Sequence, residues 1–317
     1  MMRTPLLMTV ILGLILTTAC VRVTELPSEP SQNNESSKDK EPSKNIDETA
    51  TPEVATDMGD ASYSLEITPE FSSQVEDFRL RNVPLIDFHI HLRGGMTVEK
   101  SVTSQAKTGI QSGVLENAGV DWPLSDNEKI LAFIEAAKPF PVYIGLQVND
   151  RNWFDVISPE LRERLDFILA DTMIMNDENG KPQKLWQENE YNTDDVDAWL
   201  DRYFAHCMTV VNEPVTILAN PTWLPPRVAG HYDAFWNDER MTQLIEAVVE
   251  NKVAFELQVG SAFPKDKFIE LAKSKGAKFT IGRNNMDDRQ PDFLSVFEKM
   301  RKHNLGAEDM LVLTPKR

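Results

Sequence analysis

Cysteine is almost absent from this chain of 317 residues, which contains only Cys20 and Cys207. A framework of disulfide bonds is therefore excluded, although an exported protein could form one. Basic residues are fewer than acidic ones: the chain has 33 lysines and arginines and 50 aspartates and glutamates, and its formal net charge is -17. This charge argues against binding to nucleic acid and against electrostatic docking on anionic lipid. Hydrophobic residues make up 41% of the chain, which is enough for the core of one large or two small domains.

The N-terminus lacks an apolar run long enough to span a bilayer. Residues 1–20 have a basic start, a short apolar stretch and small residues before Cys20, which is the pattern of a secretion signal. The end of this segment resembles a bacterial lipoprotein signal in which Cys20 is lipidated, although Thr17 stands where leucine is usual. The alternative is an ordinary signal peptide with an incidental cysteine. Residues 21–62 contain few large apolar side chains and predict a disordered tether. We expect residues 63–317 to form an exported domain, anchored by lipid in a bacterial cell envelope.

Two histidines lie on one apolar stretch, residues 85–92, which predicts a buried strand that ends before Gly94 and Gly95. Strict alternation would place Asp87, His89 and His91 on the same side of that strand. Imidazoles beside a carboxylate at a strand's carboxyl end are ligands that Zn²⁺, Mn²⁺ or Fe²⁺ prefers. The alternative is a strand whose histidines serve packing or hydrogen bonding.

Strand-like and helix-like segments alternate along the rest of the domain. We expect strands over residues 85–92, 113–117, 142–148, 167–175, 215–219, 253–259 and 278–282, with helices between them. The polar residues 176–190 contain Asn179-Gly180 and predict a small hairpin. Seven strand-helix units predict an α/β fold, a distorted (β/α)7 TIM-like barrel. A doubly wound open sheet is the main rival.

A barrel of seven units that opens with Asp87-Phe88-His89-Ile90-His91 resembles the polymerase and histidinol phosphatase (PHP) family, and more loosely the amidohydrolases. The resemblance covers residues 83–313 and includes residues 276–282 and the sequence Asn304-Leu305-Gly306. It implies that His89 and His91 bind metal. It also implies that histidines and carboxylates at later strand ends complete a site for two or three metal ions, which hydrolyses phosphate esters.

Later positions depart from the family pattern. Gln147 stands where a bridging glutamate is usual, Asp171 where a histidine is common, and Asn220-Pro221 in place of His-Pro. Residues 282–286 read Gly-Arg-Asn-Asn-Met in place of Gly-Ser-Asp-Ala-His, and only Glu256 keeps the look of its motif. An amide binds Zn²⁺ or Mn²⁺ far less well than imidazole or carboxylate. We therefore expect one or two divalent ions, not a trinuclear cluster.

The candidate metal ligands are the imidazoles and carboxylates at or near predicted strand ends: His89, His91, Glu116, Asp171 and Glu256. Asp171 or Glu256 would complete the coordination or act as the base that activates a bound water. Asp87 is either a ligand or a partner that orients a histidine. Glu116 and Asp171 are alternatively caps of the turns that follow them.

Arginines and amides form the candidate substrate site. Arg93, Arg151 and Arg283 follow predicted strand ends, where guanidinium groups would bind a carboxylate or phosphate. Each arginine could instead be a surface ion-pair partner. The amides at strand ends would bind a small polar molecule such as a polyol; they are Asn117, Gln147, Asn220, Asn284 and Asn285.

Three functions fit these residues. The first is a metal-dependent hydrolase, with a phosphate ester as the expected substrate. The second is a catalytically decayed surface protein that binds a ligand at the barrel mouth. The third is an amidohydrolase-like hydrolase or decarboxylase of a small carboxylic acid.

Overall fold

The computed structural model describes residues 67–316, all of which belong to one compact unit, Gly59–Arg317. The predicted signal, the lipidation of Cys20 and the tether over residues 21–62 lie outside the described residues. No helix between residues 67 and 316 has the length and apolar character needed to cross a membrane.

A closed parallel barrel forms the described part of the chain. Its seven strands are β1 (Ile86–His91), β2 (Gln111–Leu115), β4 (Tyr143–Val148), β5 (Phe167–Ala170), β8 (Ile217–Leu218), β9 (Ala254–Gln258) and β10 (Lys278–Gly282). They pair in the order β2-β1-β10-β9-β8-β5-β4, and β4 pairs with β2 to close the ring. The predicted (β/α)7 TIM-like barrel is thus confirmed. The open-sheet alternative is wrong, because an open sheet would leave β2 and β4 as unpaired edges.

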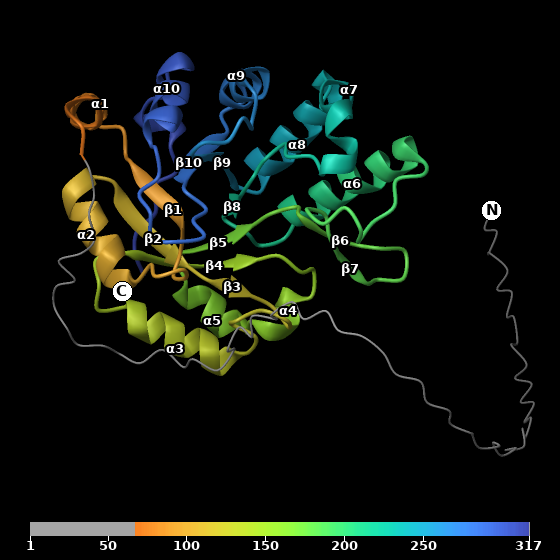
Figure 1. Ribbon diagram of the computed structural model, residues 1–317, viewed down its shortest axis with the longest axis horizontal. Coiled ribbons are helices and arrows are strands. Elements are labelled where there is room, and N and C mark those ends of the chain that lie inside the picture. Colours follow the sequence, from red (N-terminus) through yellow and green to blue (C-terminus); the bar gives the residue numbers. More distant parts are fainter. Residues whose placement is uncertain (1–66, 317) are drawn as a thin grey trace, which may run out of the picture. The chain divides into compact units, whose positions relative to one another are not determined.

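Helices cover the outside of the strands (Figure 1). They are α1 (Pro69–Leu80), α2 (Val98–Thr108), α3 (Asn127–Ala137), α4 (Trp153–Val156), α5 (Pro159–Arg164), α6 (Val196–Val211), α7 (Tyr232–Phe235), α8 (Asp238–Glu250), α9 (Asp266–Ser274) and α10 (Leu294–Lys302), with 3-10 turns η1 (Pro226–His231) and η2 (Ala307–Asp309). In Figure 1, α8, α9 and α10 lie on one side of the strands and α3 and α5 on the other. Polar caps set helix starts: Thr97 accepts from the Lys100 N–H, and Asp126 from that of Lys129. The sequence between strands thus builds the outer layer.

The predicted strand over residues 167–175 is interrupted after Ala170. The Asp171 carboxylate accepts the backbone N–H of Met173 at 2.9 Å and turns the chain out of the barrel. The next residues form β6 (Ile174–Asn176), which pairs antiparallel with β7 (Pro182–Lys184). The predicted hairpin is therefore present, and β5 is shorter than expected.

Apolar side chains fill the barrel at the amino ends of its strands. Ile86, Tyr143, Phe167 and Ile217 are the first residues of their strands and belong to one buried cluster. Gly145 provides the space, because a methyl group there would overlap the Phe167 ring. This apolar cluster fills the barrel at the amino ends of the strands, and the polar groups lie at the carboxyl ends.

The C-terminal segment closes the same end. Leu311 and Leu313 pack on the apolar cluster, and the Leu311 N–H donates to the Phe279 carbonyl at 2.9 Å. The Tyr143 hydroxyl donates to the carbonyl of Leu313 at 3.3 Å. The tail is therefore part of the barrel core.

Replacing Leu311 and Leu313 together with alanine should lower the free energy of unfolding by about 2–4 kcal/mol, because two half-buried leucines lose their packing. Urea denaturation measures this change. Val312 lies between them and is 64% exposed. The Val312→Ala variant should therefore stay within about 0.5 kcal/mol of the parent. Equal losses in both variants would mean that the tail does not pack as described.

Candidate functional site

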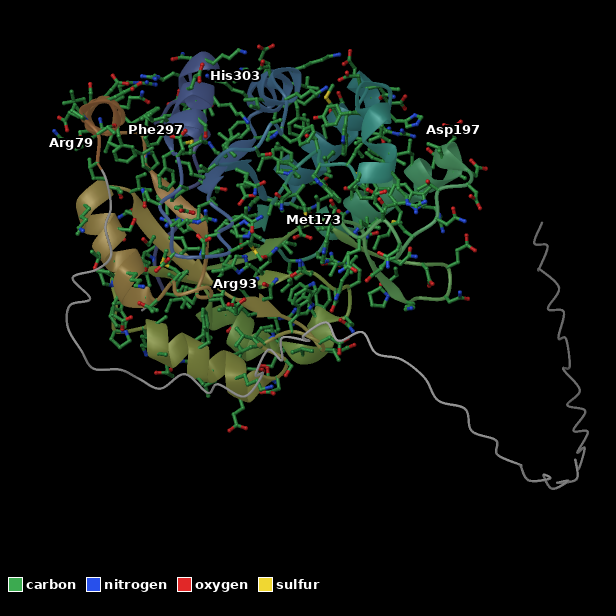
Figure 2. The ribbon with its side chains drawn as sticks, viewed as in Figure 1. Arg79, Arg93, Met173, Asp197, Phe297 and His303 are labelled. Atoms are coloured by element: carbon green, nitrogen blue, oxygen red, sulfur yellow. The ribbon has the colours of Figure 1, made fainter. Side chains whose placement is uncertain are left out.

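Polar residues gather at the carboxyl ends of the barrel strands, here called the barrel mouth. His89 and His91 lie in β1, Glu116 stands between β2 and β3 (Asn117–Ala118), Gln147 is in β4, and Glu256 is in β9. Asp171, Asn220, Arg283 and Asn284 come just after β5, β8 and β10, and Arg93 and Arg151 follow β1 and β4. Figure 2 places Arg93 and Met173 toward the centre of the molecule and His303 out in the helical layer. All predicted site residues thus lie at or near strand ends.

A β-bulge in β1 changes which side chains enter the barrel. The register between β1 and β2 shifts between Asp87 and Ile90, so β1 has one extra residue there. Phe88 packs on Phe167 in the interior, and the next residue, His89, also reaches across the interior. The Asp87 carboxylate instead accepts the backbone N–H groups of His89 and Arg283. The expectation that Asp87 lies on the same side of the strand as His89 and His91 is wrong, because the bulge breaks the alternation on which it rested.

His89 is held at both ring nitrogens. Its Nδ1 lies 2.5 Å from Glu256 Oε1, and its Nε2 lies 3.3 Å from Gln147 Oε1. Neither β9 nor β4 neighbours β1, so both contacts cross the interior. Burial disfavours the imidazolium, but the charge and hydrogen bond of Glu256 outweigh it and raise the pKa of His89. The side chains of His89 and Glu256 are almost completely buried, and their polar atoms all have hydrogen-bond partners.

Gln147 connects His89 to Asp171. Its Nε2 donates to Asp171 Oδ2 at 2.8 Å, and Asn149 Nδ2 donates to the same oxygen at 3.1 Å. Burial raises the pKa of Asp171, although the Met173 N–H and the charge of Arg151 act in the opposite direction. Asp171 therefore both caps a turn and ends a hydrogen-bonded line that starts at Glu256.

His91 belongs to a separate group. Arg93 Nη2 lies 2.7 Å from His91 Nδ1 and within hydrogen-bond distance of Glu116 Oε1 and Asn117 Oδ1, so its two N–H bonds are shared among three acceptors. Burial, with the nearby charges of His89 and Arg93, lowers the pKa of His91 to about 4. Burial acts to raise the pKa of Glu116, but the contact with His91 and the charge of Arg93 outweigh this effect, so the pKa is lowered. At neutral pH the group therefore holds a neutral imidazole and one carboxylate–guanidinium pair.

The other two predicted arginines are also ion-paired. Arg283 Nε donates to Asp87 Oδ2 at 2.5 Å, and both side chains are almost fully buried. Arg151 Nη1 donates to Glu213 Oε2 at 2.8 Å, beside the Trp153 indole N–H. Because each charge already has a carboxylate, binding of an anion by the three arginines stays a prediction.

Asn284 and Asn285 were both expected among the amides that would bind a polar molecule, and the structure gives the two residues different contacts. Asn285 Oδ1 accepts the His91 N–H at 2.8 Å, and its Nδ2 donates to the His91 carbonyl at 3.0 Å. Asn284 contributes its backbone N–H to the His89 carbonyl and has a left-handed φ of 46°. Because the two asparagines are adjacent and identical, the local sequence does not indicate which one bonds the His91 backbone and which one adopts the left-handed φ.

The loop after β8 is strained. Asn220 and Thr222 have φ values of 48° and 64°, and the second is unfavourable for a β-branched residue. The Asn220 N–H donates to Glu256 Oε2 at 3.1 Å. Its side-chain Nδ2 is buried and has no hydrogen-bond partner within residues 67–316. Strain and an unpaired donor thus coincide at the end of β8.

The described residues do not fit a metal ion in this arrangement. Among them, no three His, Cys, Asp or Glu side chains are placed to hold one. The predicted ligands divide into the line through His89, Glu256 and Asp171 and the group of His91 and Glu116, which Arg93 occupies. The predicted Zn²⁺, Mn²⁺ or Fe²⁺ therefore stays a prediction.

No protein-family model and no curated protein matches the chain. A β-mannanase of Thermomonospora fusca, solved with mannotriose, is 13% identical; the match covers 70% of this chain and 76% of that chain, with a TM-score of 0.37. A chain of an archaeal ribonuclease P solved with mature tRNA is 15% identical over 69% and 87% of the two chains, with a TM-score of 0.36. The phospho-2-dehydro-3-deoxyheptonate aldolase of Thermotoga maritima is 9% identical over 63% and 50%, with a TM-score of 0.31. Likenesses of this size carry no argument about function.

Proposed function

We propose that the protein binds a small anionic or polar molecule at the barrel mouth and that Asn220 donates a hydrogen bond to it. The unpaired Asn220 Nδ2 carries this proposal. A buried donor without a partner costs about 1–3 kcal/mol, and an oxygen of a carboxylate, phosphate or hydroxyl group would remove that cost. The strain at Asn220 and Thr222 supports the same location, since strained backbone gathers at ligand sites.

Unpaired donors at other strand ends support a ligand rich in acceptors. Arg151 Nε after β4 and Arg283 Nη1 after β10 are also buried without a partner in the described part of the chain. Both are N–H groups, as is Asn220 Nδ2. Each such N–H is complemented by an oxygen acceptor, as a carboxylic acid or a phosphate ester provides.

Binding is favoured over catalysis because the groups that would act as bases are engaged. Glu256 bonds His89 and the Asn220 N–H, and Asp171 accepts three N–H groups. Both ring nitrogens of His89 also have partners. A general base needs a free lone pair within reach of the proton that it removes.

The Asn220→Gly variant tests the proposal, because glycine accepts the left-handed φ while removing the amide. Inorganic phosphate, acetate and xylitol are titrated calorimetrically as probes of the three ligand classes. We expect at least one to bind the parent, and its affinity to fall about tenfold or more in the variant, the effect of one hydrogen bond to a charged group.

The matched control is Asn212→Gly, at the exposed C-cap of α6, which should bind like the parent. No binding of any probe to the parent, or equal affinities in parent and Asn220→Gly, would refute the proposed site.

Hydrolysis of a phosphate ester with a bound metal is the second candidate. The Glu256–His89 contact favours it, because metal-binding histidines are commonly oriented by a carboxylate. Its test is the metal content of the parent against a His89→Ala/His91→Ala variant. Near-stoichiometric metal in the parent alone would put this candidate first.

A further inference from the structure

One nitrogen of Arg93 meets three acceptors at the barrel mouth. Arg93 Nη2 lies 2.7 Å from His91 Nδ1 and within hydrogen-bond distance of Glu116 Oε1 and Asn117 Oδ1. His91 Nδ1 and Glu116 Oε1 are themselves 3.5 Å apart. The imidazole nitrogen and the carboxylate oxygen are ligands that a divalent transition metal prefers, and the amide oxygen of Asn117 would add a weaker third ligand.

Other residues hold these acceptors in place. The Asn285 amide bonds both the N–H and the carbonyl of His91. Asn117 Nδ2 donates to Asn149 Oδ1 at 2.6 Å, which turns its Oδ1 toward Arg93, and the Asn117 N–H donates to Glu116 Oε1 at 2.8 Å. The acceptors are therefore positioned by the strand ends as well as by the guanidinium.

A metal ion and this guanidinium exclude each other. Both carry positive charge, and both would need the same lone pairs of His91, Glu116 and Asn117. The Arg93 side chain is 30% exposed, whereas those of His91 and Glu116 are 2% and 12% exposed. Arg93 thus reaches into the group from the solvent side, and its removal leaves the acceptors attached to the barrel.

We infer that Arg93 is a built-in cation that takes the place of a divalent metal at the His-x-His sequence, and that an uncharged side chain there opens a metal site on His91, Glu116 and Asn117. The disagreement between the sequence pattern and the observed ion pair leads to this assignment. It does not depend on the ligand proposed for Asn220.

Zinc titration of the full chain tests the inference. The protein is first treated with a chelator and dialysed. The parent should bind Zn²⁺ weakly at this group. Arg93→Met, which keeps the length of the side chain without its charge, should bind about one equivalent at least 100-fold more tightly. Substituting Co²⁺ gives a second readout, because its visible absorption reports an imidazole and oxygen ligand set in the variant.

Two controls accompany this measurement. Arg93→Met/His91→Ala should lose the gained site. Arg151→Met frees Glu213, which has no imidazole neighbour among its described contacts, and should gain no Zn²⁺. Circular dichroism verifies the fold, and Arg93→Gln serves as a second uncharged variant if Arg93→Met does not fold.

Two results would overturn the inference. One is near-stoichiometric Zn²⁺ in the parent that disappears in His91→Ala, which would also promote the hydrolase candidate. The other is a folded Arg93→Met or Arg93→Gln variant that binds no more Zn²⁺ than the parent. Neither result bears on binding at Asn220, which its own variant tests.

Discussion

Replacing Glu256 with alanine should lower the free energy of unfolding by about 3–5 kcal/mol, the usual effect of removing one partner of a buried ion pair. The side chains of Glu256 and His89 are 1% and 0% exposed. Without the carboxylate, the His89 imidazole loses its 2.5 Å partner, and the Asn220 N–H loses its acceptor. Water cannot replace either bond without entering the barrel, so the desolvation of both groups remains uncompensated.

Urea denaturation, followed by circular dichroism, measures this effect. Glu246 provides the matched control, because it also pairs with a cation, Lys275, but is 61% exposed. Glu246→Ala should change the free energy of unfolding by less than about 1 kcal/mol. A similarly small change in Glu256→Ala would show that the His89–Glu256 pair does not support the barrel.

Gly282→Ala should destabilise the fold by about 3 kcal/mol, at the upper end of the range for added core atoms. Gly282 is the last residue of β10. A methyl group there would overlap Glu256 Oε1 and lie 2.9 Å from His89 Cβ. Both neighbours are buried and bonded to each other, so neither can move into solvent. The variant must therefore break the pair or displace a strand.

Gly230→Ala is the control for this substitution. A methyl group at Gly230 would meet no atom within 4 Å in the described part of the chain. Its effect should stay within about 0.5 kcal/mol. Thermal unfolding of Gly282→Ala, Gly230→Ala and the parent measures the difference in stability between the two variants. A Gly282→Ala protein as stable as the parent would mean that Glu256 can leave its place freely.

The barrel could be predicted because the sequence patterns that indicate its strands and helices each extend over only a few neighbouring residues. Runs such as residues 142–148 and 278–282 are apolar and bounded by turn residues, and helix patterns lie between them. Parallel strands then bring their carboxyl ends to one face, which is why the polar residues at those ends were expected to meet there. The end of β5 at Ala170 was not predicted, because strand-like residues continue to Met175, although Asp171 was an alternative candidate for the cap of the turn that follows it.

The sequence by itself determined the seven-unit barrel, the hairpin after β5 and the gathering of the candidate site residues at the strand ends. Only the tertiary structure decided the bulge that separates Asp87 from His89 and the choice of Asn285 as the clamp on His91. It also decided that Arg151 pairs with Glu213 and Arg283 with Asp87, residues 62 and 196 positions apart. The reason is physical: periodicity and turn chemistry act over a few residues, whereas an ion pair forms between whichever side chains the closed barrel brings within reach.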